Sequence, residues 1–356
     1  MSPADTLAAD PVIERDDLLL QKLDLDDPRW VEFVTGMPTA MLFHHPVWAK
    51  TLSECYGYPA FVLARLQDGR VTAGFPVMEV KRPWGPRRWV SLPFTDYCPP
   101  LDSSSRGDAL LAEANAVARD AGVERLEIRA PVAGPSFQSR LVGVRHTLRL
   151  DPNADVVRRS FHRSTKYDIK FAERSPVSVH RGEVRTDLTD AFYGLHMRTR
   201  RRQGVPVQPQ RFFELLWQHV IGAGFGFVLL AYAGTTPIAG AVYLVWGKTT
   251  IHKYGASNPD FLNLRPNHLV AWDAIRWACE NGYSSFDFGR SDLANVGLRA
   301  YKNKWGTRED ELRYSGIGGL ASDPPRSLQR ALATIIRASP LSVTRALGEL
   351  LYPFAA

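Results

Sequence analysis

Residues 226–254 read GFVLLAYAGTTPIAGAVYLVWGKTTIHKY. Three runs in this stretch, 226–233, 237–245 and 249–254, are rich in β-branched and aromatic residues, and a polar turn at 233–235 joins the first two. This pattern predicts three consecutive β-strands.

A similar pattern occurs earlier in the chain. The sequence FVLA at 61–64 precedes AG at 73–74, and FVLL at 227–230 precedes AG at 239–240, with 12 residues from Phe to Ala both times. Each copy continues with a predicted helix that ends near a glycine, Gly122 or Gly282, as a left-handed helix terminus requires. A short predicted strand follows each glycine. Two matches in the same order indicate two copies of one αβ unit.

The second copy gives the fuller order of elements. A strand is predicted at 177–184, followed by helices at 187–203 and 209–221 and by the three strands above. A helix at 266–281, a strand at 284–288, a helix at 295–305 and a last strand near 312–314 complete it. This order is that of the GNAT acyltransferase fold. We therefore expect a mixed α/β (α+β) protein with two tandem GNAT-like domains.

Charge and composition add further segments. Residues 1–27 carry eight acidic and two basic residues, whereas residues 158–211 carry 13 basic and five acidic ones. Residues 154–173 are predicted to form one basic helix, and apolar and arginine residues after 320 predict an amphipathic tail. The expected division is an acidic segment at 1–27, domains at 28–152 and 176–318, a basic linking helix at 153–175 and a helical tail at 319–356.

The composition limits the class of protein. Apolar residues make up 45% of the 356 residues, charged residues 23%, and the net charge is +7. No apolar run is long enough to cross a bilayer, and the start lacks the basic and apolar regions of a secretory signal. The three scattered cysteines suit a reducing compartment. We expect a cytoplasmic protein, either free or peripheral on the inner face of the plasma membrane through its tail, that needs no metal or cofactor and has an anionic partner.

Several motifs together resemble the FemABX (FemAB-like) family of peptidoglycan-bridge aminoacyltransferases. They are FHHPVW at 43–48, SLPFTDY at 91–97, YGASN at 254–258, FDFGRS at 286–291, and Gly-Leu, Tyr-Lys and Trp-Gly pairs at 297–306. The resemblance implies two tandem GNAT-like domains and the transfer of an amino acid from aminoacyl-tRNA to an amine of a peptidoglycan precursor. The sustained heptads of the coiled-coil arm found in some members are absent.

The aromatic-lysine pair at 301–302 provides the first catalytic candidate. Leu298, Tyr301 and Trp305 form the stripe of the predicted helix that should face the core, and Arg299 and Lys302 lie on a neighbouring stripe. A fixed cation at Lys302 could stabilise the oxyanion or the leaving group of acyl transfer. The resemblance also implies that this lysine belongs to the catalytic region; an ordinary surface lysine is the alternative.

Two further catalytic candidates lie in apolar and aromatic surroundings. Asp96 is a carboxylate in a position that is costly unless it is paired, and it could orient or deprotonate the incoming amine. Tyr254 lies where GNAT strands separate to admit the acyl group and could donate a hydrogen bond to the substrate. Structural roles, a turn for Asp96 and packing for Tyr254, are equally consistent with the sequence.

The remaining candidates would bind substrate. Basic residues on one face of the predicted linking helix could hold a diphosphate; alternatively, they form a solvated surface. The full set of substrate-binding candidates is Arg163, Lys166, Lys170, Ser257, Arg290, Arg299 and Tyr301.

The segment before the helix at 266–281 bears on the donor. Enzymes of the GNAT class that use acetyl-CoA carry a glycine-rich loop there, whose N–H groups bind pyrophosphate at the helix N-terminus. Residues 257–267, SNPDFLNLRPN, contain no glycine. This favours aminoacyl-tRNA as the donor. Two alternatives stay open: a CoA-dependent N-acyltransferase that modifies an amino sugar or exopolysaccharide, and a non-catalytic scaffold that binds RNA or lipid.

Overall fold

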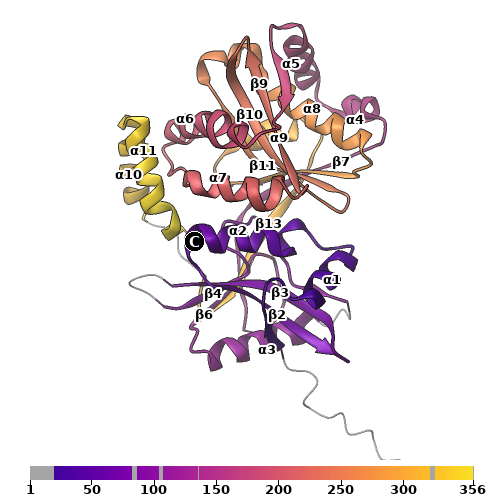
Figure 1. Ribbon diagram of the computed structural model, residues 1–356, viewed down its shortest axis with the longest axis vertical. Coiled ribbons are helices and arrows are strands. Elements are labelled where there is room, and N and C mark those ends of the chain that lie inside the picture. Colours follow the sequence, from indigo (N-terminus) through magenta and orange to yellow (C-terminus); the bar gives the residue numbers. More distant parts are fainter. Residues whose placement is uncertain (1–19, 82–85, 104–106, 135, 321–324, 356) are drawn as a thin grey trace, which may run out of the picture.

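The computed structural model describes residues 20–81, 86–103, 107–134, 136–320 and 325–355. Two halves lie one above the other in Figure 1, and their strands form one continuous sheet of 13 strands within the described residues. The sheet order is β1-β2-β3-β4-β6-β13-β7-β12-β11-β10-β9-β8, with β5 paired to β3.

The strands of the first half pair antiparallel to one another, except for one parallel pair. Its strands are β1 (Leu20–Leu23), β2 (Ala60–Gln67), β3 (Arg70–Val80), β4 (Arg88–Val90), β5 (Leu101–Asp102) and β6 (Arg125–Ile128). Its helices are α1 (Pro28–Gly36), the short η2 (Leu42–His44), α2 (Pro46–Tyr56) and α3 (Gly107–Asp120). Asp68 and Gly69, both with positive φ, form the tight turn between β2 and β3. The acidic segment predicted at 1–27 thus contributes β1; residues 1–19 lie outside the described residues.

The second half repeats this plan with more helices. Its strands are β8 (Ser178–Arg181), β9 (Gly226–Ala233), β10 (Thr236–Trp246), β11 (Thr249–Ser257) and β12 (Ser285–Ser291). Its helical segments are α4 (Ala154–Ser160), α5 (Arg163–Arg174), η3 (Asp187–Phe192), α6 (Tyr193–Gln203), α7 (Gln210–Leu216), η4 (Trp217–Ile221), η5 (Pro259–Leu264), α8 (Pro266–Glu280) and α9 (Val296–Asn303). In both halves a strand that follows a helix pairs in parallel with the third strand of the meander: β6 with β4, and β12 with β11.

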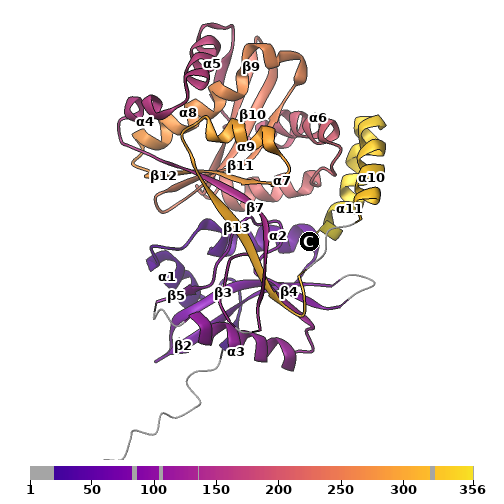
Figure 2. The same ribbon diagram turned by 180° about the vertical axis from the view of Figure 1, so that it is seen from behind.

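The last strand of each half crosses to the other half. β7 (Gln138–Arg149) follows the first half in sequence but pairs with β12 of the second. β13 (Arg308–Ile317) follows the second half but pairs with β6 of the first, and β7 and β13 pair with each other. Figure 2 shows both strands running between the halves. This exchange joins the halves and places the ends of β12 and β13 at their junction.

The halves also share a core. Trp48 on α2 packs edge-on against Phe212 on α7, with ring centroids 6.2 Å apart, and one buried apolar cluster contains residues from both halves. The stabilisation of the junction therefore comes from burial of large aromatic side chains as well as from strand pairing.

The basic segment predicted as one helix consists of two. α4 ends at Ser160. The next residue, Phe161, has an extended backbone, is 2% exposed and packs edge-on against Trp305. His162 then begins α5, because its ring accepts a hydrogen bond from the N–H of Ser164. The single-helix prediction is wrong because burial of Phe161 requires a break in the helix.

The tail consists of α10 (Arg326–Ala338), α11 (Leu341–Leu351) and the short η6 (Tyr352–Ala355). The two helices lie beside α6, and the chain ends next to α2 at the junction of the halves (Figure 1). In the described part of the chain, no helix has the length and apolar character to cross a membrane.

Candidate active site

A bulge in β12 forms the centre of the site. The pairing of β12 with β7 shifts register between Asp287 and Arg290, and Gly289 has a φ of 69°. One oxygen of Asp287 accepts the N–H of Gly289 at 2.8 Å, and the other accepts Arg145 Nε at 2.7 Å. The bulge turns the carbonyls of residues 289 and 290 toward α9.

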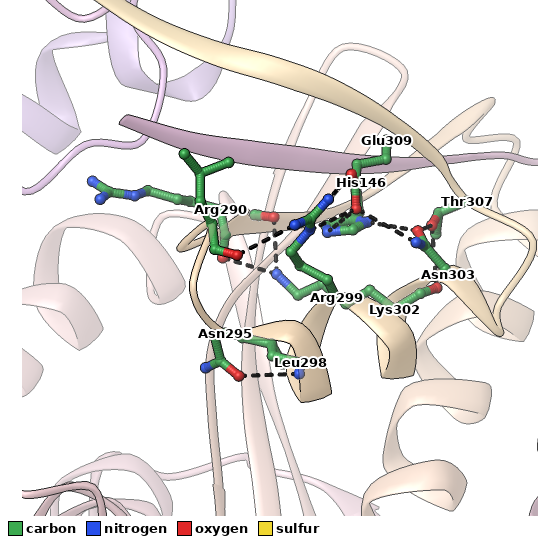
Figure 3. Close-up of polar contacts among 11 residues, drawn as sticks. His146, Arg290, Asn295, Leu298, Arg299, Lys302, Asn303, Thr307 and Glu309 are labelled. Carbon is green, nitrogen blue, oxygen red and sulfur yellow. Dashed lines mark hydrogen bonds and ion pairs between the residues drawn. The ribbon is translucent and has the colours of Figure 1, made fainter. Parts of the chain in front are cut away.

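Lys302 on α9 meets these carbonyls. Its Nζ donates hydrogen bonds to the carbonyl oxygens of Gly289 and Arg290, both at 2.9 Å (Figure 3). An ammonium has three N–H donors, so one donor has no hydrogen-bond partner among the described residues. The residue is only 6% exposed. Burial lowers the pKa of Lys302 to about 8, although the charges of Asp96, Asp287 and Asp292 oppose this effect.

The stripe prediction for α9 is wrong in part. Leu298, expected in the core, is 37% exposed, whereas Lys302 is buried. The inward carbonyls of the bulge need a donor, and the lysine supplies it. Arg299 points to β13 instead, where it forms an ion pair of 2.6 Å with Glu309, which also lies near His146 (Figure 3).

Asp96 reaches the same place from the first half. It follows Leu92 and Phe94, two non-glycine residues with positive φ, which is a costly conformation that often marks functional loops. A Cβ added at Gly289 would lie 3.5 Å from Asp96 Oδ2, so the carboxylate lies beside the bulge. Burial raises the pKa of Asp96, but the charges of Lys253, Arg290 and Lys302 outweigh it, and the net pKa is lowered. Asp96 is therefore an ionised carboxylate at neutral pH.

Lys253 is a site residue that the sequence reasoning missed. Its side chain is 4% exposed, and its Nζ lies 3.4 Å from Asp96 Oδ2 and 3.2 Å from the carbonyl oxygen of Phe94. The ammonium also lies 5.2 Å from the ring centroid of Phe43 and 5.3 Å from that of Trp48, within range of cation–π attraction. A lysine in the middle of a predicted strand between two aromatic rings, His252 and Tyr254, is the signal available in the sequence.

An aromatic wall lies next to Asp96. The ring of Tyr254 lies 5.8 Å from that of Phe212, and the ring of Tyr56 lies 4.5 Å from that of Phe94. Burial raises the pKa of Tyr254 well above its ordinary value, so its phenol keeps its proton and can donate a hydrogen bond. Tyr352 of the tail stacks on Phe94 with centroids 5.1 Å apart.

The end of the tail is thus part of the wall. Besides stacking on Phe94, Tyr352 stacks on Tyr56 at 5.9 Å, and the hydroxyl of Tyr58 donates to the carbonyl of Pro353 at 2.9 Å. These contacts join residues nearly 300 positions apart. Sequence periodicity contains no signal for them, and Tyr352 was not among the predicted site residues.

The other predicted site residues lie in different places. Arg290 lies at the site, since it pairs with Asp292 at 2.8 Å and the charge of Asp96 acts on it. Ser257 is buried, and its backbone is bound by the Thr199 hydroxyl. Tyr301 packs against His268 on the far side of α9. Arg163 and Lys170 are exposed on α5, and Lys166 donates to the carbonyl of Arg159. Among the described residues, none of these three forms a hydrogen bond or ion pair with Asp96 or Lys302.

The segment before α8 holds a carboxylate. Arg265, with a φ of 57°, pairs through Nε with Asp168 Oδ1 at 3.0 Å, and His268 Nε2 lies 3.5 Å from the same carboxylate. These contacts occupy the Arg265 guanidinium, which would otherwise be available to a pyrophosphate at the start of α8. Within the described ranges, no group of three or more His, Cys, Asp or Glu side chains is arranged to hold a metal ion.

The buried lysine predicts a pH dependence of stability. Because the pKa of Lys302 falls from 10.5 to about 8 on folding, the unfolded chain binds more protons between these values, and stability rises with pH there. At pH 7 the shift costs roughly 3 kcal/mol. The free energy of urea unfolding is measured for the wild type and for Lys302→Met. The difference, wild type minus variant, should increase by about that amount from pH 7.5 to 10.5. A difference that stays flat across this range would contradict the assignment.

Comparison with known proteins places this geometry in a class. Residues 158–303 match the sequence profile of the family described as "Acetyltransferase (GNAT) domain". The chain has a tandem GNAT fold: a tandem GNAT protein from the clavulanic acid biosynthesis pathway has a TM-score of 0.52 at 12% identity, covering 86% of this chain and 100% of that one. The structure of FemX gives a TM-score of 0.66 at 18% identity, over 83% of this chain and 96% of FemX.

Curated sequence relatives match the chain over a short segment. Lipid II:glycine glycyltransferases from Staphylococcus epidermidis and Staphylococcus aureus are 33% identical over 76 residues, and that from Staphylococcus saprophyticus is 34% identical over the same length. The matched segment is 20% of this chain and 18% of each relative. With the fold of FemX, these matches confirm the resemblance to FemAB-like proteins.

Proposed function

We propose that the protein is an amide-forming acyltransferase of the FemAB-like type, acting on an amine of a peptidoglycan or other cell-envelope precursor. The observation that carries the proposal is the juxtaposition of a buried lysine, Lys302, with an ionised carboxylate, Asp96, at the junction of two GNAT-like halves. The similarity to lipid II:glycine glycyltransferases supports the class of acceptor.

In this proposal the amine nitrogen of the acceptor attacks the carbonyl of an activated acyl ester. Asp96 orients the acceptor ammonium by accepting a hydrogen bond from it, and the ammonium first loses one proton to solvent to give the neutral amine that attacks. The free N–H of Lys302 stabilises the oxyanion of the tetrahedral intermediate. A C–N bond forms, the ester C–O bond breaks, and Lys302 donates a proton to the leaving oxygen; the proton lost by the amine restores it. A pKa of about 8 suits such an acid.

The proposed donor is aminoacyl-tRNA. The glycine-free segment between β11 and α8 and the pairing of Arg265 with Asp168 at the start of α8 both weigh against pyrophosphate of CoA at its usual position. The GNAT family match favours acyl-CoA as the second candidate donor, with an amino sugar or exopolysaccharide as acceptor.

The roles that we propose for individual residues are those that the sequence predicts. We propose catalytic roles for Lys302, Asp96 and Tyr254, and a diphosphate-binding role for the basic residues of α5. The proposed domains are 28–152 and 176–318, and each contributes its last strand to the other. A cytoplasmic location with peripheral membrane contact through the tail would suit a lipid-linked acceptor.

The direct test is a reaction with charged tRNA and a muropeptide acceptor linked to a nucleotide or a lipid. We expect mass spectrometry to show an acceptor heavier by one aminoacyl residue, and ribonuclease treatment of the donor to abolish the product. Product from acetyl-CoA instead of charged tRNA would establish the second candidate. RNA binding without turnover of either donor would favour a non-catalytic scaffold.

A thermal-shift measurement tests, without turnover, whether the protein binds acetyl-CoA or the diphosphate-linked acceptor. A ligand present at 100 times its Kd stabilises the folded state by about 2.7 kcal/mol. We expect the diphosphate-linked acceptor to raise the Tm by several degrees and acetyl-CoA at the same concentration to leave it unchanged. A shift with acetyl-CoA alone would overturn the interpretation of the segment before α8.

A further inference from the structure

Four arginines line one cavity beside the tail, away from Lys302. Arg198, Arg201 and Arg202 come from α6 and Arg337 from α10, while Asn258 and Asp260 at the start of η5 line another side. The cavity has a volume of about 260 Å³.

The cavity carries an excess of positive charge. Guanidinium groups stay charged at every physiological pH. In the described part of the chain, none of the four forms an ion pair with a carboxylate, and Asp260 is the one acidic residue of the lining. Four positive charges against one negative charge leave a site that an anion would stabilise.

Backbone contacts hold two of the arginines in place. Arg201 Nε donates to the carbonyl of Arg337 at 3.4 Å, and Arg337 donates to the carbonyls of Arg202 at 3.4 Å and Gln203 at 3.1 Å. A Cβ added at Gly204 would lie 2.8 Å from Ala333 Cβ, so α6 and α10 touch closely here. The guanidinium groups of Arg201 and Arg337 are therefore partly oriented before a ligand arrives, which reduces the entropic cost of binding.

We propose that this cavity is a binding site for a headgroup-sized anion with one or two phosphates. Arginine binds phosphate oxygens through paired N–H donors. The volume is below the roughly 300–1,000 Å³ of sites for drug-sized ligands, and none of the lining residues is an aromatic side chain that could stack on a base. Both features favour a small phosphate group over a nucleotide or RNA.

The phosphate has two possible sources, a soluble phosphate compound or an anionic phospholipid. The tail exposes Leu328, Ile335, Val343 and Leu350, which are the kinds of side chain that interfacial helices insert into a membrane. The test therefore needs a soluble and a membrane probe.

The informative variant is Arg198→Gln/Arg202→Gln, because neither side chain forms a hydrogen bond or ion pair with another described residue. Inorganic pyrophosphate should raise the Tm of the full-length wild type, and the variant should bind it at least about tenfold more weakly. Co-sedimentation with phosphatidylglycerol vesicles, compared with phosphatidylcholine vesicles, tests the lipid source. Binding to phosphatidylglycerol that the variant loses assigns a lipid; pyrophosphate binding alone assigns a soluble phosphate.

The matched control is Arg70→Gln/Arg119→Gln, which removes two exposed arginines in the first half. It should bind both probes as the wild type does. Equal loss in the control would show a general effect of charge and overturn the proposal. So would unchanged binding by the Arg198→Gln/Arg202→Gln variant, or binding of RNA but of neither probe.

Discussion

Replacing Lys302 by alanine should lower kcat by about 10²- to 10³-fold and leave KM for the acceptor nearly unchanged. Loss of one preorganised donor to an oxyanion has an effect of this size. An interaction made only in the transition state changes kcat and not ground-state binding. Since the ammonium is the active form, the wild-type kcat should fall as the pH rises through about 8. The measurement is steady-state amide formation between pH 6 and 10.

The matched control is Lys304→Ala, which removes an exposed lysine two residues away. It should keep both the rate and the alkaline fall. Lys302→Arg keeps a cation but changes its shape, and should recover only part of the loss. A Lys302→Ala protein that is folded and turns over at the wild-type rate would remove Lys302 from the mechanism.

Local elements of the fold could be predicted from the sequence because short-range chemistry determines them. The strand predicted at 226–233 coincides with β9, and the helix predicted at 266–281 with α8, within one residue. Gly122 and Gly282 both have positive φ just beyond α3 and α8, as predicted for residues that end helices. The aromatic-lysine pair also indicates Lys302 as a catalytic candidate from the sequence alone.

Contacts between distant segments could not be predicted in the same way. The exchange of β7 and β13 depends on pairing energies summed over the whole sheet, and each strand alone would suit either half. Likewise, the sequence around Asp96 gives no indication that Lys253 is its partner, 157 residues away. Arg299 lies three residues from Lys302 on the predicted helix, and the sequence gives no indication that Glu309 on an exchanged strand pairs with it. These contacts share one feature: sequence spacing describes a helix face and does not describe what packs on it.

Asp96 provides the second large effect. Asp96→Asn keeps the size of the side chain and removes its charge, and we expect turnover to fall by about 10²-fold or more, as for loss of a group that handles the acceptor proton. The matched control is Asp120→Asn, which removes an exposed carboxylate of the first half whose charge is not among those acting on Lys302. That control should lose little activity.

The pH profile distinguishes a role in the site from a role in folding. The charge of Asp96 raises the pKa of Lys302, so removing that charge lowers this pKa. In Asp96→Asn the alkaline fall of kcat should therefore begin at a lower pH than in the wild type. A variant with less folded protein would lose rate equally at every pH and keep the wild-type profile. If the rate is reduced but the alkaline fall of kcat occurs at the same pH as in the wild type, Asp96 does not act on Lys302, and the proposed site is contradicted.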